Sequence, residues 1–178
     1  MVKLADLGDL LTATPALRAL RLRFPEAKVS ALVTPHTAPL LWENDAVDRI
    51  LTFPKAVFDQ WDGIGSPARA ARALGHVANL ARQLRTETWD AVFLFHHLTT
   101  PGGRAKYQGL LAATGAPRRF GLDNGSATCF TDSVPDQGFG AYHEVDYWLQ
   151  VVGLVGARLA QPRLEVFLTH AAPVAGVA

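Results

Sequence analysis

The sequence predicts one α/β domain built on a doubly wound parallel sheet. Short apolar segments typical of strands alternate with segments of helical periodicity, which is the order that parallel strands joined by crossover helices require. The strand candidate at 90–96 is an almost unbroken apolar run, as expected when helices cover both faces of a sheet. With 178 residues, 49% of them hydrophobic and 19% charged, the chain can bury a sizeable core.

The first part of the chain predicts a β-α-β-α-β order. Its strand candidates are 2–5, 28–34 and 47–53, and its helix candidates are 10–24 and 38–43. Gly8 predicts a turn directly after the first strand. Thr14-Pro15 allows two interpretations, because Pro15 can be the first residue of a helix capped by Thr14 or a kink in a helix that starts near Asp9.

The second part continues the alternation. A loop is expected at 58–67, and Ser66-Pro67 predicts the start of a helix that ends near Arg85. After the strand at 90–96 we expect a Gly-Gly loop at 99–104, a helix to Thr114, a strand at 118–122 and a helix at 142–155. The domain is expected to span 1–168, with 169–178 beginning a linker.

Composition argues against several classes of protein. A formal net charge of +1 lacks the strong positive field of a typical nucleic-acid binder. The single cysteine, Cys129, excludes an internal disulfide and any cysteine-based zinc site, which favours a reducing, cytoplasmic setting. Asp6 interrupts the N-terminus before any signal-like apolar run, and no later stretch is apolar enough to span a bilayer. Peripheral attachment to the inner membrane surface is left open.

The usual catalytic and phosphate-binding motifs are missing from the sequence. Neither Gly-x-x-x-x-Gly-Lys-Ser/Thr nor Gly-x-Gly-x-x-Gly follows the first strand, and the second strand runs into Thr34-Pro35-His36 instead of a ribose-binding acid. No Gly-x-Ser-x-Gly is present. His96 and His97 are neighbours on a strand and point to opposite faces, so we expect no metal site there, and Cys129 is interpreted as an inert, half-buried thiol.

Asp9 is the candidate that remains, because it follows the first strand at the edge where open α/β sheets bind ligands. Its carboxylate has two interpretations. It can cap a helix by accepting from free backbone N–H groups. It can also act as a general base toward an acceptor hydroxyl.

Several segments add a family resemblance in a fixed order along the chain. The opening segment is Gly8-Asp9-Leu10-Leu11-Thr12-Ala13-Thr14-Pro15-Ala16-Leu17-Arg18-Ala19-Leu20-Arg21, then Phe24-Pro25 with Ala27. The later segments are Ala46-Val47-Asp48-Arg49-Ile50, Leu84-Arg85 with Trp89-Asp90-Ala91-Val92, Arg118-Arg119-Phe120-Gly121-Leu122, and His143-Glu144-Val145-Asp146-Tyr147-Trp148-Leu149. Together they resemble the family 9 glycosyltransferases, the bacterial heptosyltransferases of lipopolysaccharide biosynthesis.

The resemblance implies a Rossmann-like doubly wound parallel sheet that forms the N-terminal lobe of a GT-B fold. By the same resemblance, that lobe would bind an anionic, lipopolysaccharide-type acceptor, while a C-terminal lobe, absent from this sequence, would hold a nucleotide-sugar donor such as ADP-heptose. No further cofactor is implied. The resemblance makes Asp9 the catalytic base of an inverting transfer.

Acceptor-binding roles are expected for Gly8, Thr12, His97 and Arg104. Gly8 would allow a tight backbone turn. Thr12 is also interpreted as a cap or packing group, and Arg104 as a solvated arginine or a partner for phosphate or acidic sugars. The arginines at 69, 72, 82 and 85 are interpreted as the wet face of one helix, with a weak role toward anionic lipid left open.

Other functions stay open. Because GT-B enzymes react in the cleft between two lobes, the chain is expected to be a fragment or to need a partner chain for catalysis. One alternative is a stand-alone saccharide-binding or regulatory domain derived from such an enzyme. Another is the first lobe of a different GT-B enzyme, such as a nucleotide-sugar epimerase.

Overall fold

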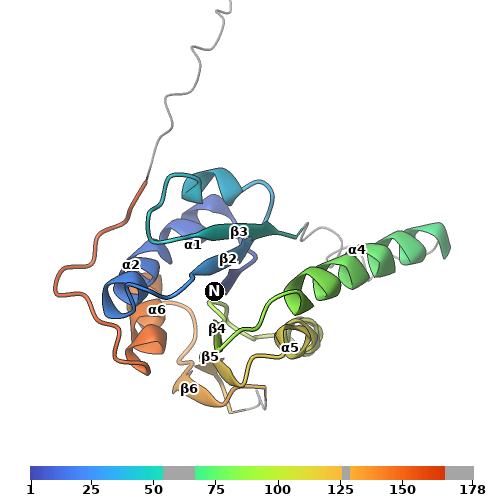
Figure 1. Cartoon of the computed structure of the whole chain (residues 1–178). Coiled ribbons are helices and arrows are strands. Elements are labelled where there is room, and N and C mark those ends of the chain that lie inside the picture. The colour runs from blue at the N-terminus through green and yellow to red at the C-terminus, as the bar shows by residue number, and fades with distance from the viewer. Residues whose placement is uncertain (54–66, 126–128, 167–178) are drawn as a thin grey trace, which may run out of the picture.

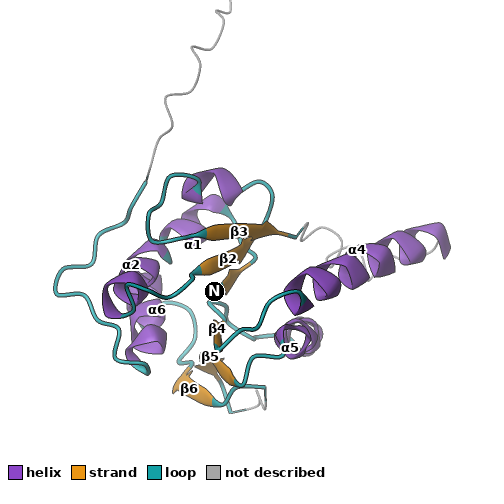
Figure 2. Ribbon diagram, in the orientation of Figure 1, coloured by secondary structure: helices purple, strands orange, loops and turns teal. Residues whose placement is uncertain are grey.

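The protein is a three-layer α/β structure in which helices cover both faces of parallel strands (Figures 1 and 2). The computed structural model describes residues 1–53, 67–125 and 129–166, and of residues 67–74 it describes the backbone. The strands are β1 (Val2–Lys3), β2 (Ser30–Val33), β3 (Arg49–Thr52), β4 (Ala91–Phe93), β5 (Arg118–Asp123) and β6 (Asp132–Pro135). The helices are α1 (Leu7–Leu11), α2 (Thr14–Arg23), the 3₁₀ helix η1 (Ala38–Leu41), α4 (Pro67–Arg85), α5 (Pro101–Thr114) and α6 (Glu144–Gly153).

The described strands pair in parallel in two groups, β1-β2-β3 and β4-β5-β6. A parallel bridge between Val2 and Leu94 joins the groups, and the Phe95 backbone N–H donates to the Val2 carbonyl over 3.0 Å. The spatial order is therefore β3-β2-β1-β4-β5-β6. This is the strand order of a doubly wound Rossmann-like sheet, so the fold class predicted from the sequence is confirmed.

Alternate side chains of β4 and the residues after it enter different cores. Val92 and Leu94 pack in the cluster that includes Leu80 of α4 and Leu110 of α5. Phe93 and Phe95 pack in the cluster of α2 and α6, where Phe95 stacks on Trp148 at 5.3 Å between ring centroids. A strand that buries both faces needs apolar residues at every position, which explains the unbroken apolar run.

The region around Thr14-Pro15 combines features of both interpretations. α1 ends at Leu11 and α2 begins at Thr14, with Ala13 as its N-cap and Pro15 inside the first turn. Pro15 therefore starts a separate helix, where its missing N–H costs no helical hydrogen bond. The Thr14 side chain does not cap α2: its hydroxyl donates to the Leu11 carbonyl over 2.8 Å and accepts from the Glu165 backbone over 2.9 Å.

One loop expected from the sequence is part of a helix, and one strand was missed. Residues 101–104 of the Gly-Gly loop expected at 99–104 are the first turn of α5. Thr100 caps this helix through its hydroxyl and Pro101 suits its first turn, which offsets the low helix propensity of Gly102 and Gly103. Strand β6 was not predicted. It is polar and ends in Pro135, which an edge strand tolerates.

Some expectations lie outside the described residues. These are the loop at 58–66, the side chains of Arg69 and Arg72, and the linker at 169–178. Of the same predicted wet face, Arg82 and Arg85 are exposed on α4, as expected. None of the helices in the described residues combines the length and apolar character needed to cross a lipid bilayer.

Phe95→Ala tests the packing between the sheet and α6. Phe95 is fully buried, so we expect the free energy of unfolding to fall by about 3–5 kcal/mol, the usual cost of removing a buried phenyl ring. Urea denaturation followed by circular dichroism measures it. The control is Leu22→Ala, at a side chain 62% exposed on α2, for which the change should stay within about 0.5 kcal/mol. Equal midpoints for the two variants would contradict this packing.

Candidate functional site

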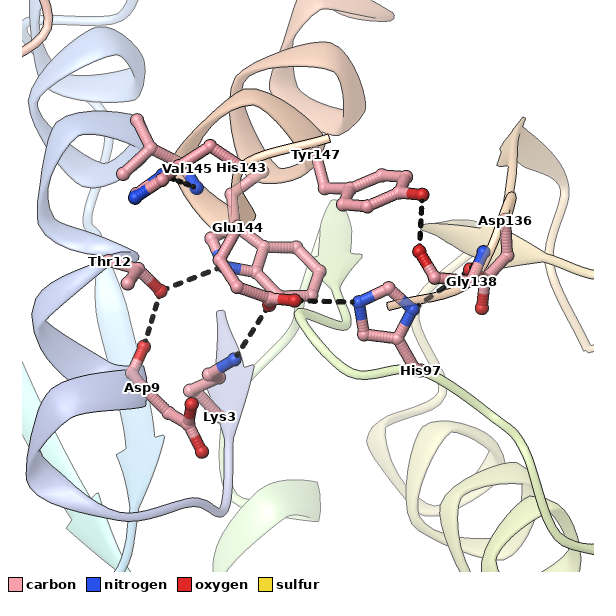
Figure 3. Close-up of polar contacts among 11 residues, drawn as sticks. Lys3, Asp9, Thr12, His97, Asp136, Gly138, His143, Glu144, Val145 and Tyr147 are labelled. Atoms are coloured by element: carbon pink, nitrogen blue, oxygen red, sulfur yellow. Dashed lines mark hydrogen bonds and ion pairs between the residues drawn. The ribbon is translucent and has the colours of Figure 1, made fainter. Parts of the chain in front are cut away.

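The carboxyl ends of β1 and β4 form the switch point of the sheet, since the chain proceeds in opposite directions from these two strands. In open α/β sheets this is where ligands bind. The chain from β1 continues into α1, and the chain from β4 continues through His97 toward α5. The segment after β6 and the start of α6 complete the same edge (Figure 3).

Asp9 lies in the first turn of α1 and is exposed. It is not the helix cap, because Asp6 holds the N-cap position and makes no capping hydrogen bond with its side chain. Within the described residues the structure gives the Asp9 carboxylate no hydrogen-bond partner. The capping interpretation of Asp9 is therefore wrong, and its carboxylate is accessible at the ligand-binding edge.

Thr12 fixes the backbone beneath Asp9. Its hydroxyl donates to the Asp9 carbonyl over 2.7 Å and accepts from the indole Nε1 of Trp148 over 3.0 Å (Figure 3). Thr12 is thus a C-cap and packing group that connects α1 to α6. Its role toward an acceptor stays a prediction.

Gly8 does not form a tight turn. It is the second residue of α1 and has no positive φ, so the structural role expected for it is wrong. A Cβ built on Gly8 would meet no atom within 4 Å. The space beside Asp9 is therefore open.

His97 is buried, with 5% of its surface exposed. Its Nδ1 lies 2.9 Å from an Asp136 carboxylate oxygen and its Nε2 lies 3.1 Å from a Glu144 carboxylate oxygen (Figure 3). Because both ring nitrogens are used, His97 is a bridge between two acids in this structure. His96 contacts Tyr107 of α5 on the opposite face, 4.5 Å between centroids, which confirms that the two histidines diverge.

Aromatic rings enclose His97 on the α6 side. Phe139 lies 4.4 Å, Tyr147 5.0 Å and Trp148 5.7 Å from the His97 ring, centroid to centroid. Burial raises the pKa of Tyr147, whose hydroxyl donates to the Gly138 carbonyl over 2.8 Å. The imidazole is thus fixed on its faces as well as at its nitrogens.

Arg104 lies apart from this group. It belongs to α5, which packs on the opposite face of the sheet from α1 and α6. Its Nε is buried and has no hydrogen-bond partner among the described residues. Its acceptor-binding role stays a prediction. Cys129 is half-buried, and burial raises the pKa of its thiol, which agrees with an inert side chain.

Sequence reasoning missed three charged residues of the site: Lys3, Asp136 and Glu144. Lys3 ends β1 and is 3% exposed, with its Nζ 4.0 Å from a Glu144 oxygen and 4.2 Å from the centroid of the Trp148 ring. A lysine inside an apolar strand is a signal in the sequence, since lysine is almost never fully buried unless it is paired. The two acids gave no such signal.

The site therefore combines an exposed carboxylate with a buried chain of charged and polar groups. In the described part of the chain, no group of three or more His, Cys, Asp or Glu side chains could hold a metal ion. What the exposed carboxylate can do chemically is accept a proton from a ligand bound at this edge.

Comparison of the sequence with protein-family models and with curated proteins finds no match. Solved structures do match. The glycosyl transferase family 9 structure from Veillonella parvula DSM 2008 has a TM-score of 0.71 and 16% identity, over 94% of this chain and 44% of that one. E. coli heptosyltransferase WaaC, solved with ADP, has a TM-score of 0.66 and 17% identity, over 93% of this chain and 50% of its own.

A third match is the E. coli ADP-heptose lps heptosyltransferase II, with a TM-score of 0.62 and 18% identity, over 95% of this chain and 46% of that one. The chain thus spans about half the length of these proteins. It has the fold of one lobe of the family 9 heptosyltransferases, as the sequence resemblance predicted.

His97→Ala tests the buried bridge. The substitution leaves Asp136 and Glu144 without their shared partner, so we expect the free energy of unfolding to fall by about 2–4 kcal/mol. Denaturant unfolding at neutral pH measures it. The control is His76→Ala at an exposed position of α4, where the change should be within about 0.5 kcal/mol. If both variants unfold at the wild-type midpoint, His97 does not hold the acids together.

Proposed function

We propose that this chain is the N-terminal, acceptor-binding lobe of an inverting glycosyltransferase, with Asp9 as the catalytic base. The donor is a nucleotide sugar, with heptose as the expected sugar, and the acceptor is a saccharide of the lipopolysaccharide-core type. The observation that carries the proposal is the exposed carboxylate of Asp9 at the switch point of the sheet.

The proposed chemistry is one displacement. The Asp9 carboxylate takes the proton of an acceptor hydroxyl while the hydroxyl oxygen bonds to the anomeric carbon of the donor. The bond from that carbon to the nucleotide diphosphate breaks, and its electron pair leaves with the diphosphate. Attack from the face opposite the leaving group inverts the anomeric configuration.

The solved relatives support a nucleotide-sugar donor. WaaC has been solved with ADP and with ADP-2-deoxy-2-fluoro heptose. Because this chain spans about half of WaaC, we expect the donor to be held by a second lobe, either from the same polypeptide or from a partner chain. The sheet edge that carries Asp9 would then form one wall of the reaction cleft.

The acceptor is proposed to bind in the open space at Gly8. A saccharide could approach the α1 backbone closely there, because no side chain fills the space. Thr12 and His97 would act by holding α1 and Glu144 in place. Arg104 would meet a phosphate or acidic sugar of the acceptor, since guanidinium groups bind such anions through charge-assisted hydrogen bonds.

Asp9→Asn tests the base. In the protein that combines this lobe with its donor lobe, we expect the transfer rate to fall by about 10²–10⁴-fold, the usual contribution of a general base, with the fold unchanged. Transfer of sugar from a nucleotide-sugar donor to a lipopolysaccharide-core oligosaccharide, followed by mass spectrometry, measures it. The control is Asp6→Asn, which removes an equal charge three residues away and keeps a good helix cap.

The same assay separates the alternatives. Wild-type turnover in Asp9→Asn would remove Asp9 from the mechanism. Conversion of the nucleotide sugar without an acceptor would indicate an epimerase. Acceptor binding that never leads to transfer in the completed protein would indicate a saccharide-binding domain.

Gly8→Ala tests close approach of the acceptor. Alanine in α1 should raise the free energy of unfolding by about 0.5–1 kcal/mol, because it restricts the unfolded chain more than glycine does. Affinity for the core oligosaccharide should nevertheless fall, by about tenfold for a lost contact of about 1.4 kcal/mol. Isothermal titration calorimetry measures it. The control is Gly75→Ala, at an equally open position of α4, which should leave affinity unchanged. Unchanged affinity in Gly8→Ala would place the acceptor elsewhere.

A further inference from the structure

A buried ammonium group lies beside the proposed base. Lys3 is 3% exposed, although a lysine ammonium is strongly hydrated in water. Its Nζ lies over the face of Trp148, 4.2 Å from the ring centroid, and 4.0 Å from a Glu144 oxygen. Glu144 and Trp148 are four residues apart on α6, so one face of this helix supplies both contacts.

Lys3 also interacts with Asp9. Figure 3 shows the Lys3 ammonium between the carboxylates of Asp9 and Glu144. Burial lowers the pKa of Lys3 to about 8, and the negative charges of Asp9 and Glu144 oppose that shift. With so little of Lys3 exposed, a ligand cannot bind it directly. Lys3 can influence a ligand through Asp9, which is exposed.

Helix α6 holds Lys3 through Glu144 and Trp148, and it also holds the backbone of Asp9. Trp148 donates to Thr12, and Thr12 donates to the Asp9 carbonyl, which fixes the backbone that carries the base. Glu144 is held in turn by the Nε2 of His97. The same helix that contacts Lys3 therefore also fixes the backbone of Asp9.

We propose that Lys3 is a positioning residue for Asp9: its buried ammonium, held by Glu144 and Trp148, supplies the positive charge that orients the exposed Asp9 carboxylate at the switch point of the sheet. This inference rests on the function proposed above. Loss of the Lys3 proton removes the charge that faces Asp9, so the transfer rate should fall as pH rises through about 8.

The titratable side chains around Lys3 come from several elements. Asp9 faces it from α1 and Glu144 from α6, and His97, after β4, contacts Glu144 on its far side. Asp136, after β6, contacts His97 in turn. Among the described residues of this chain, Lys3 is the group whose shifted pKa lies near 8.

Stability and activity should change in opposite directions above pH 8. The folded-state pKa of Lys3 is below its ordinary value of 10.5, so between about pH 8 and 10.5 the unfolded chain binds more protons than the folded one. The contribution of Lys3 to stability therefore rises with pH in that window. A fall in rate there cannot be attributed to unfolding caused by Lys3.

The first test is the pH profile of kcat and KM in the protein completed by its donor lobe, for wild type, Lys3→Arg and Lys3→Met. Wild type should lose activity with a midpoint near pH 8. Lys3→Arg keeps its charge at every pH used and should lose that alkaline decline. Lys3→Met, similar in length but uncharged, should lower kcat at least about tenfold at pH 7, with little change in KM and no decline near 8. The lysine control is Lys28→Met, at an exposed side chain near Glu87.

Two outcomes would overturn the role of Lys3: wild-type kcat in Lys3→Met at pH 7, or an alkaline decline that persists in Lys3→Arg. The failure of the proposed function looks different, because Asp9→Asn would then be active. Inactive Asp9→Asn together with fully active Lys3→Met would reject Lys3 alone.

A second test uses the 178-residue chain and requires no substitution of Lys3, so it remains valid if the Lys3 variants do not fold. The titration of the Lys3 side chain is followed by NMR in wild type, Asp9→Asn and Asp6→Asn. Removal of the Asp9 charge should lower the Lys3 midpoint by about one pH unit, since a nearby opposite charge favours the charged form, whereas Asp6→Asn should leave it in place. An unchanged midpoint in Asp9→Asn would show that the two groups are not coupled, and would overturn the proposal.

Discussion

The parallel pairing of β1 with the stretch that follows β4 is the contact on which the site depends. Val2 opposes Leu94, and the Phe95 backbone N–H donates to the Val2 carbonyl, so two three-stranded groups become one sheet. Because the strands are parallel, their carboxyl ends meet at one edge. Lys3 at the end of β1 and His97 after β4 thereby contact the same Glu144 carboxylate, although about ninety residues separate them along the chain.

Helix α6 fixes the positions of the side chains at these strand ends. Glu144 in its first turn contacts both Lys3 and His97, and Trp148 one turn later contacts Lys3 and Thr12. Buried charged groups destabilise a fold unless each has a partner. The partners here come from both halves of the sheet, so correct folding of the whole domain is required before the polar chain is satisfied. Asp9, at its exposed end, is the member that a ligand can reach.

The fold and the proposed activity rest on different observations. Similarity to solved heptosyltransferases at 16–18% identity establishes the fold of one lobe. A fold alone does not imply a function, because one fold supports many unrelated activities. The proposed base and acceptor contact rest on the site: an exposed acid at the switch point, an open space at Gly8, and a buried cation behind the acid. The nucleotide-sugar donor is proposed from the solved relatives.

The sequence alone determined the alternation of helices and strands and singled out Asp9, because periodicity, turn residues and the position of an acid after a strand are local properties. Tertiary structure alone decided which groups surround that acid. Asp136 and Glu144 lie 39 and 47 residues from His97, and no local pattern indicates that one imidazole will bridge them. The burial of Lys3 also depends on tertiary structure, because β1 is central only when β2 pairs on one of its edges and the stretch after β4 on the other. Local sequence patterns thus determined the helices and strands and indicated Asp9. The pairing of strands distant in sequence determined which side chains surround Asp9.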